Sequence, residues 1–221
     1  MKRWRQQELR FKTRGGRRRG AGRKPARLRA GVPHRARPLH QKGHPVHVTF
    51  RASRRLPSLR KQLVFEAMRR ALRHTVRSWF RIVHYSVQVD HVHLLVEADD
   101  KVSLSRRIAG AAIRLALAVN RASGRRGNVW SDWYHARALR TPREVRHGIV
   151  YVLMNWKKHV SGASGVDPRS SAASFKGWTL PPPLGPPLGE TGAEPPATWL
   201  LRTGWKRHGL VAATERPRGS I

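Results

Sequence analysis

VQVDHVHLLVEADD, residues 87–100, is the stretch that decides the fold. Side chains in a strand alternate between its two faces, so every second residue shares a face. One face of this stretch is aliphatic and suits a core, with Val92, Leu94 and Val96. The opposite face carries His91 and His93 as neighbours. The stretch therefore predicts a strand that packs on one side and presents two imidazoles on the other.

Hydrophobic periodicity predicts seven elements between residues 44 and 160. Strands are expected at 44–52, 80–89, 91–98 and 134–140, and helices at 56–80, 104–122 and 142–160. The first six elements follow the order of the ferredoxin-like split βαβ arrangement (βαββαβ). We therefore expect an α+β fold: an antiparallel sheet with two helices on one face, an added C-terminal helix and an irregular tail.

Helix start signals and apolar stripes support the three helices. Pro57 with Ser58 should start the first, Ser103 should cap the second, and Thr141 with Pro142 should start the third. Helical spacing also predicts which apolar residues face the core. The expected core residues include Leu63, Met68 and Leu72 in the first helix, Ile108, Ile113 and Leu117 in the second, and Val145, Ile149, Val152, Trp156 and Val160 in the third.

Composition divides the chain into three parts. Residues 1–43 interleave Arg with Gly and are expected to be disordered, either as a DNA-contacting arm or as a solubilising tail that binds any polyanion. Residues 44–160 should form the folded domain. Residues 161–221 are rich in Ser, Gly and Pro and read as a linker-like tail, with a short docking segment that contains Trp199, Leu200, Leu201 and Trp205.

The charge of the chain points to a polyanionic partner. Lys and Arg number 46 against 12 Asp and Glu, a formal net charge of +34. Nucleic acid is the first candidate and an anionic membrane surface the second. No apolar run is long enough to span a membrane, and the N-terminus lacks the apolar core of a secretory signal, although a mitochondrial transit peptide stays open. The absence of cysteine excludes thiolate nucleophiles and Cys-based zinc sites, so any metal needs nitrogen and oxygen ligands.

The paired histidines are candidate metal ligands. Their spacing lets both rings approach one ion, although two of the 12 histidines could also fall at this spacing by chance. Asp90, just before them, could be a further ligand or could cap the turn. On the last predicted helix, Tyr151 and Asn155 lie one turn apart and off the core stripe. If that face meets the histidines, the site would combine imidazoles, an amide oxygen and a phenol, which suits attack on a phosphate.

Other catalytic classes lack their motifs. The sequence contains no G-x-S-x-G elbow, no phosphate-binding G-x-x-x-x-G-K-[ST] loop and no acidic cluster of the two-metal nuclease kind. Tyr85 and Tyr134 lie in predicted strands, where packing is their natural role. Tyr151 is therefore the candidate nucleophile.

HVH at 91–93, followed by YVLMNWKKH at 151–159, resembles the single-tyrosine HUH transposases, in which HUH stands for His, hydrophobe, His. The chain is most similar to the REP-associated tyrosine transposase branch, which YHARALRTPREV at 134–145 also resembles. The resemblance covers residues 44–160. Two positions depart from the family pattern: Asp90, where relatives often carry Asn, and Trp156, where many carry Pro.

The resemblance implies a function for each candidate residue. His91 and His93 would bind Mg²⁺ or Mn²⁺ with Asn155 as the third ligand, and Tyr151 would attack single-stranded DNA to form a 5′-phosphotyrosine link. Hairpin-bearing DNA would be the partner, bound by the basic residues Arg14, Arg17, Arg18, Arg19, Arg23, Lys24 and Lys158. A monomer or homodimer in the bacterial cytoplasm, associated with the nucleoid and not with membrane, would fit this role.

Two alternatives remain open from the sequence. The first is a non-catalytic basic protein that binds DNA or RNA. The second is a replication initiator or relaxase with the same site, although such proteins are usually larger.

Overall fold

The computed structural model describes residues 40–75, 79–160, 162–182, 192–217 and 219, which all belong to one compact unit, Leu39–Ile221. The predicted arm lies outside the described residues, apart from its last four positions. The DNA contacts expected of its basic residues therefore stay predictions: Arg14, Arg17, Arg18, Arg19, Arg23 and Lys24.

The described chain is built on a four-stranded antiparallel sheet in the order β2-β3-β1-β4. The strands are β1 (Val46–Arg51), β2 (Phe80–Val87), β3 (His91–Ala98) and β4 (His135–Ala138). The stretch that was predicted to decide the fold is β3, and it lies inside the sheet between β2 and β1. The α+β class and the βαββαβ order are confirmed.

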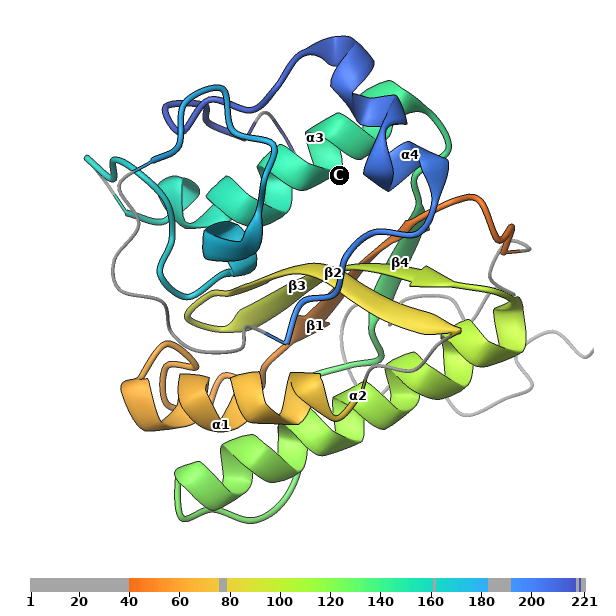
Figure 1. Cartoon of the computed structure of the whole chain (residues 1–221). Coiled ribbons are helices and arrows are strands. Elements are labelled where there is room, and N and C mark those ends of the chain that lie inside the picture. Colours follow the sequence, from red (N-terminus) through yellow and green to blue (C-terminus); the bar gives the residue numbers. More distant parts are fainter. Residues whose placement is uncertain (1–39, 76–78, 161, 183–191, 218, 220–221) are drawn as a thin grey trace, which may run out of the picture. The chain divides into compact units, whose positions relative to one another are not determined.

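Two helices cover one face of the sheet (Figure 1), as predicted: α1 (Gln62–Arg73) and α2 (Lys101–Ala122). Their predicted starts are wrong. α1 begins at Gln62, after Pro57 and Ser58. Asp100, and not Ser103, caps α2, because its carboxylate accepts hydrogen bonds from the backbone N–H groups of Val102 (2.7 Å) and Ser103 (2.8 Å). A carboxylate at this position also interacts favourably with the positive end of the helix dipole.

Part of the predicted core stripe on these helices is also wrong. Leu63, Ile113 and Leu117 are exposed. Met68, Leu72 and Ile108 are buried as predicted. The other buried residues are Val64 and Phe65 on α1, and Ala111, Leu115 and Val119 on α2. Small residues such as Ala111 let α2 approach the sheet closely. The face of α2 that packs on the sheet therefore includes small residues, while the large residues Ile113 and Leu117 lie on its exposed face.

The third helix, α3 (Pro142–Met154), covers the other face of the sheet. Its predicted start is confirmed by a capping box, in which Thr141 and Glu144 each accept a hydrogen bond from the other's backbone. Val145, Ile149 and Val152 are fully buried, as expected. The predicted end at 160 is wrong, since α3 ends at Met154, continues as a 3₁₀ turn, η1 (Asn155–Lys158), and leaves Val160 exposed.

The described part of the tail is packed and does not behave as a linker. It contains η2 (Ser171–Ser174), α4 (Trp199–Arg202) and η3 (Gly204–His208). As predicted, Leu200, Leu201 and Trp205 are buried, but Trp199 remains 46% exposed. Ala172, Phe175 and Trp178 are buried with them against α3. The sheet is therefore the middle of three layers, with α1 and α2 on one side and α3 with the tail on the other.

The tail is also hydrogen-bonded to the edge strand β2. The backbone N–H of Val87 donates to the carbonyl of Arg169 (2.9 Å), and that of Glu194 donates to the carbonyl of Ile82 (2.8 Å). Asp167, which is fully buried, accepts two hydrogen bonds of 2.8 Å from the Arg60 guanidinium. A charge-assisted pair of this geometry fixes the tail to the start of α1.

No helix in the described part of the chain is both long and apolar enough to cross a membrane.

One buried histidine predicts how stability should depend on pH. Burial lowers the pKa of His84, packed against Phe175, to about 4. The unfolded chain then binds more protons between pH 6.5 and 4, so the free energy of unfolding should fall by about 3 kcal/mol across that range. His84→Leu should flatten this dependence in denaturant titrations at several pH values, whereas replacing the exposed His74 by Leu should not. A pH dependence unchanged in His84→Leu would contradict the assignment.

Candidate active site

The two histidines of β3 lie on the face of the sheet that α3 covers. Val92, Leu94 and Val96 pack in the core beneath α1 and α2, while Leu95 packs in the core beneath α3. Strand alternation therefore places His91 and His93 beside α3, as the sequence predicted. Their ring centroids are 4.7 Å apart.

A hydrogen bond engages the Nδ1 atom of each histidine. His91 Nδ1 lies 2.7 Å from Asp90 Oδ1, and His93 Nδ1 lies 3.1 Å from His47 Nε2 and 3.0 Å from Thr49 Oγ1. In each ring Nε2 is then the atom that remains to bind an ion. His93 Nε2 is buried and, within the described residues, has no hydrogen-bond partner.

Asp90 has a role that the sequence did not predict. Its carboxylate accepts a hydrogen bond from His91, and its other oxygen lies 3.7 Å from the Arg51 guanidinium. A carboxylate that holds the distal nitrogen of a metal-binding histidine fixes the orientation of the ring and makes it a better ligand. Asp90 therefore orients His91.

α3 brings the predicted tyrosine to the histidines, and the predicted amide, Asn155, follows at the start of η1. The Tyr151 ring centroid lies 5.1 Å from that of His93. Asn155 is 1% exposed, and neither its Oδ1 nor its Nδ2 has a hydrogen-bond partner among the described residues. Buried amides are usually satisfied, so this pair of unpartnered atoms points to a group that binds there. Lys158 Nζ lies over the Tyr151 ring, 4.3 Å from its centroid.

Three residues of the site were missed by the sequence reasoning. His47 and Thr49 lie on β1, where the register places Thr49 opposite His93, and His47 contacts Tyr151 with ring centroids 5.5 Å apart. His159 follows η1 and contacts His91 at 5.3 Å. The alternation of "VHVT" already put His47 and Thr49 on one face, but only the β1–β3 register shows that this face is the one with the histidine pair.

Burial keeps the imidazoles of the site neutral. Burial, with the positive charge of Arg137 adding to it, lowers the pKa of His47 to about 4. The pKa of His93 is lowered still further by burial and by its histidine neighbours. Burial also lowers the pKa of His91, although the Asp90 carboxylate opposes this shift. Neutral imidazole is the form that binds metal, so these rings are ready for a ligand at neutral pH.

The pKa of Tyr151 changes in the opposite direction from the pKa values of the histidines. Burial raises the pKa of its phenol, and the neighbouring Asn155 amide partly opposes the rise. Burial lowers the pKa of the Lys158 ammonium beside it. Both shifts favour the neutral form of the group, and a neutral amine beside a phenol can accept its proton.

The candidate ligands are nitrogen and oxygen atoms, which suit a divalent cation such as Mg²⁺ or Mn²⁺. No group of three His, Cys, Asp or Glu side chains in the described chain is arranged to hold a metal. The candidate set instead joins the Nε2 atoms of His91 and His93 with Asn155 Oδ1. Two of these atoms, His93 Nε2 and Asn155 Oδ1, are buried and unpartnered, which a bound cation would correct.

Comparison with known proteins identifies the domain. Residues 40–145 match the family described as "Transposase IS200 like". The predicted resemblance to this transposase family is confirmed over this region. The matched region ends before Tyr151. The evidence that Tyr151 lies at the site is therefore its contact with His93 in the structure. No curated protein matches the chain.

One of two similar solved structures shares the fold. A REP-associated tyrosine transposase bound to a REP hairpin aligns with a TM-score of 0.56 and 21% identity, over 76% of this chain and 100% of that one. A transposase-like protein from Deinococcus radiodurans R1 aligns with a TM-score of 0.37 and 17% identity, over 50% of this chain and 87% of that one. The first similarity supports the ferredoxin-like assignment of the described unit.

The contact between His47 and His93 predicts a measurable effect on metal binding. His47→Leu removes one partner of His93 Nδ1, so the affinity for Mn²⁺ should fall by about 10- to 100-fold. His47→Gln, which can keep a hydrogen bond, should retain more of it. Isothermal titration of the full chain with Mn²⁺ measures both, with His74→Leu as a control of the same residue type far from the site. Equal affinities for wild type and His47→Leu would rule this role out.

Proposed function

We propose that this protein is a metal-dependent single-tyrosine DNA strand transferase that cleaves and rejoins single-stranded DNA. The observation that carries the proposal is the contact of Tyr151 with His93 across two layers of the fold, with the unpartnered Asn155 amide four residues beyond the tyrosine. A phenol, paired imidazoles and an amide oxygen in one buried place suit nucleophilic attack on a phosphodiester.

The reaction begins with the Tyr151 hydroxyl. Its oxygen forms a bond to the scissile phosphorus as the phenolic proton leaves, and the bond from phosphorus to the 3′-oxygen breaks. The 3′-oxygen takes a proton and leaves as a free 3′-OH, while the 5′ side stays attached through phosphotyrosine. Rejoining reverses these steps with a 3′-OH as the nucleophile. The phosphotyrosine bond conserves the energy of the cleaved bond, so no nucleotide hydrolysis is needed.

His91, His93 and Asn155 would hold Mg²⁺ or Mn²⁺. When bound, the ion would polarise a phosphate oxygen and stabilise the charge that develops on it. Asp90, His47 and Thr49 fix the orientation of the two imidazoles.

Lys158 is suited to assist Tyr151. Its ammonium lies over the phenol ring, where it would stabilise the phenolate, and its lowered pKa would let it exchange a proton with the hydroxyl. It would also lie close to the scissile phosphate, in keeping with its predicted DNA contact.

A basic cavity beside α3 offers a path for the DNA. Its volume is about 730 Å³. Three arginines line it, of which Arg137 and Arg146 form ion pairs with the lining residues Glu144 and Glu215, while Arg216 adds positive charge. Together with the charge of the chain, this supports hairpin-bearing single-stranded DNA as the partner, with protein acting as a monomer or homodimer in the bacterial cytoplasm, associated with the nucleoid.

The mechanism predicts a covalent adduct whose polarity identifies it. The full chain is incubated with Mn²⁺ and a pool of hairpin-bearing single strands, labelled either at the 3′ or at the 5′ end, and run on a denaturing gel. The 3′ label should remain on the protein and the 5′ label should appear on a shorter free strand. Tyr151→Phe should form no adduct, because it lacks the nucleophilic oxygen, while Tyr134→Phe should form it normally.

Three outcomes would contradict this mechanism: adduct from Tyr151→Phe, equal adduct after chelation of metal, or retention of the 5′ label. Salt-sensitive DNA binding without adduct under any metal would instead support the non-catalytic binding protein.

The contact between Lys158 and Tyr151 predicts a change in rate and in pH dependence. A cation over an aromatic ring contributes about 0.5–2 kcal/mol, so Lys158→Gln should slow adduct formation by about 2- to 30-fold. Because the raised pKa of Tyr151 makes phenolate scarce, the rate should rise with pH, and the loss in Lys158→Gln should be largest at low pH. Lys176→Gln is a charge-matched control. A uniform loss at all pH values would mean that Lys158 acts on DNA binding alone.

A further inference from the structure

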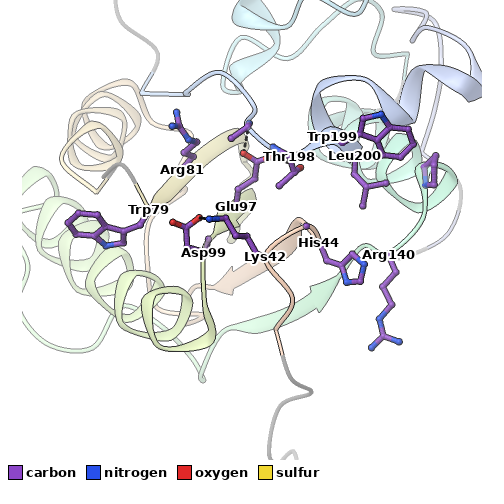
Figure 2. Close-up of a pocket in the computed structure, with 14 residues that line it drawn as sticks. Lys42, His44, Trp79, Arg81, Glu97, Asp99, Arg140, Thr198, Trp199 and Leu200 are labelled. Carbon is purple, nitrogen blue, oxygen red and sulfur yellow. Dashed lines mark hydrogen bonds and ion pairs between the residues drawn. The ribbon is translucent and has the colours of Figure 1, made fainter.

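A second cavity opens at the other end of the sheet. Its volume is about 730 Å³, and it lies where β1 and β2 begin and β3 ends (Figure 2). Glu97 lies four residues beyond His93 on the same face of β3, a separation of about 13 Å along a strand. The cavity is thus on the catalytic face of the sheet, but outside the group of residues around Tyr151.

Two tryptophans stand at the ends of this cavity. Trp79 lies at one end and Trp199 at the other, with Lys42, Glu97 and Asp99 between them. Trp79 is 44% exposed and Trp199 is 46% exposed. Large aromatic side chains left half in solvent at the mouth of a cavity are typical of binding surfaces.

Each indole is held in place by its surroundings. The Arg107 guanidinium lies 5.5 Å from the Trp79 ring centroid, and that of Arg207 lies 4.9 Å from the Trp199 centroid. Trp199 also rests against Gly204, where an added Cβ would come within 2.6 Å of the ring. The indoles are therefore ordered platforms with a positive charge at each.

The acidic groups of the cavity are already engaged. Glu97 is buried and accepts hydrogen bonds from the backbone N–H groups of Ala197 (2.7 Å) and Thr198 (2.9 Å). Asp99 forms an ion pair of 3.2 Å with Lys42. The guanidiniums of Arg81 and Arg140 also line the cavity, and no carboxylate in the described chain pairs with either. The groups that bind Glu97 are neutral, so its carboxylate offsets one of these two guanidiniums and the cavity keeps a small excess of positive charge.

We propose that this cavity binds unpaired bases of single-stranded DNA, with Trp79 and Trp199 stacking on bases and Arg81 and Arg140 contacting phosphates. Sequence-tolerant binding of a single strand needs this combination of aromatic platforms and basic groups. Charge complementarity favours an anionic occupant, because the cavity has more cationic than anionic side chains. Duplex DNA does not fit the role, since its bases are stacked on one another.

This inference rests on the proposed function, because it names a second place at which the substrate strand is held, away from Tyr151. It predicts that the protein grips the strand at two points on one face of the sheet. The distal point would set how far from the cleavage position the DNA must remain unpaired.

The test measures binding of a fluorescein-labelled thymidine oligonucleotide to the full chain by anisotropy. Base stacking contributes about 1–3 kcal/mol, so Trp79→Ala and Trp199→Ala should each weaken binding by about 5- to 140-fold. Trp133→Ala is the matched control, since Trp133 is 70% exposed and lies outside the cavity. Arg81→Gln should weaken binding more than Arg121→Gln, which removes the same charge from the outer face of α2.

A crosslinking measurement keeps the inference independent of the fold of the variants. An oligonucleotide with a 5-bromodeoxyuridine should crosslink under ultraviolet light to peptides that contain Trp79 or Trp199. Crosslinking should persist in Tyr151→Phe and without metal. Crosslinking at Trp79 or Trp199, in a wild-type protein that forms no phosphotyrosine adduct, would support the cavity as a DNA site and contradict the strand-transfer function.

Several results would overturn the cavity as a DNA site. One is unchanged affinity in both tryptophan variants while adduct formation proceeds, which would leave the strand-transfer function standing. Another is equal loss of affinity in Trp133→Ala. A third is a polyglutamate peptide that displaces the labelled oligonucleotide as effectively as unlabelled oligonucleotide does. That result would indicate an acidic protein partner instead.

Discussion

The alternation of side chains along β3 is the constraint on which the rest of the structure depends. β3 lies inside the sheet with a helical layer on each side, so both of its faces must be buried. Val92 and Val96 supply the packing beneath α1 and α2, and this leaves His91 and His93 beneath α3. A shift of one residue in the pairing with β1 would exchange the two faces and bury the imidazoles in the aliphatic core. The register that stabilises the core is therefore also the register that builds the site.

The site is divided between layers that are distant in sequence. The sheet supplies His47, His91 and His93, and α3 with η1 supplies Tyr151 and Asn155. No local contact along the chain holds the two groups together, so the packing of Val145, Ile149 and Val152 on the sheet determines whether the phenol meets the imidazoles. Tail contacts strengthen this alignment, because Arg146 on α3 forms a bidentate pair with Glu215 at 2.8 and 3.0 Å.

Signals that act within one element were readable from the sequence. The alternation of β3, the capping box of Thr141 with Glu144, and the spacing of Tyr151 and Asn155 all depend on neighbours in the chain. The cap of α2 was predicted wrongly because Asp100 and Ser103 are both good capping residues. Which of them caps the helix depends on where β3 ends and the helix begins. Ile113 and Leu117 were placed in the core because α2 packs through smaller residues such as Ala111. The role of His47 depends on the β1–β3 register, which no local pattern encodes.

The sequence prediction for the tail was wrong for a related reason, and the contacts of the tail affect whether the domain that precedes it can fold alone. Ser, Gly and Pro are typical of linkers, yet Val87 and Ile82 on the edge strand β2 are hydrogen-bonded to this segment. An edge strand without such cover is a template for pairing with other chains. A chain cut after residue 160 would expose that edge together with the apolar side chains Val83 and Leu95, and would tend to aggregate. The segment that resembles a dispensable extension thus protects the solubility of the domain that precedes it.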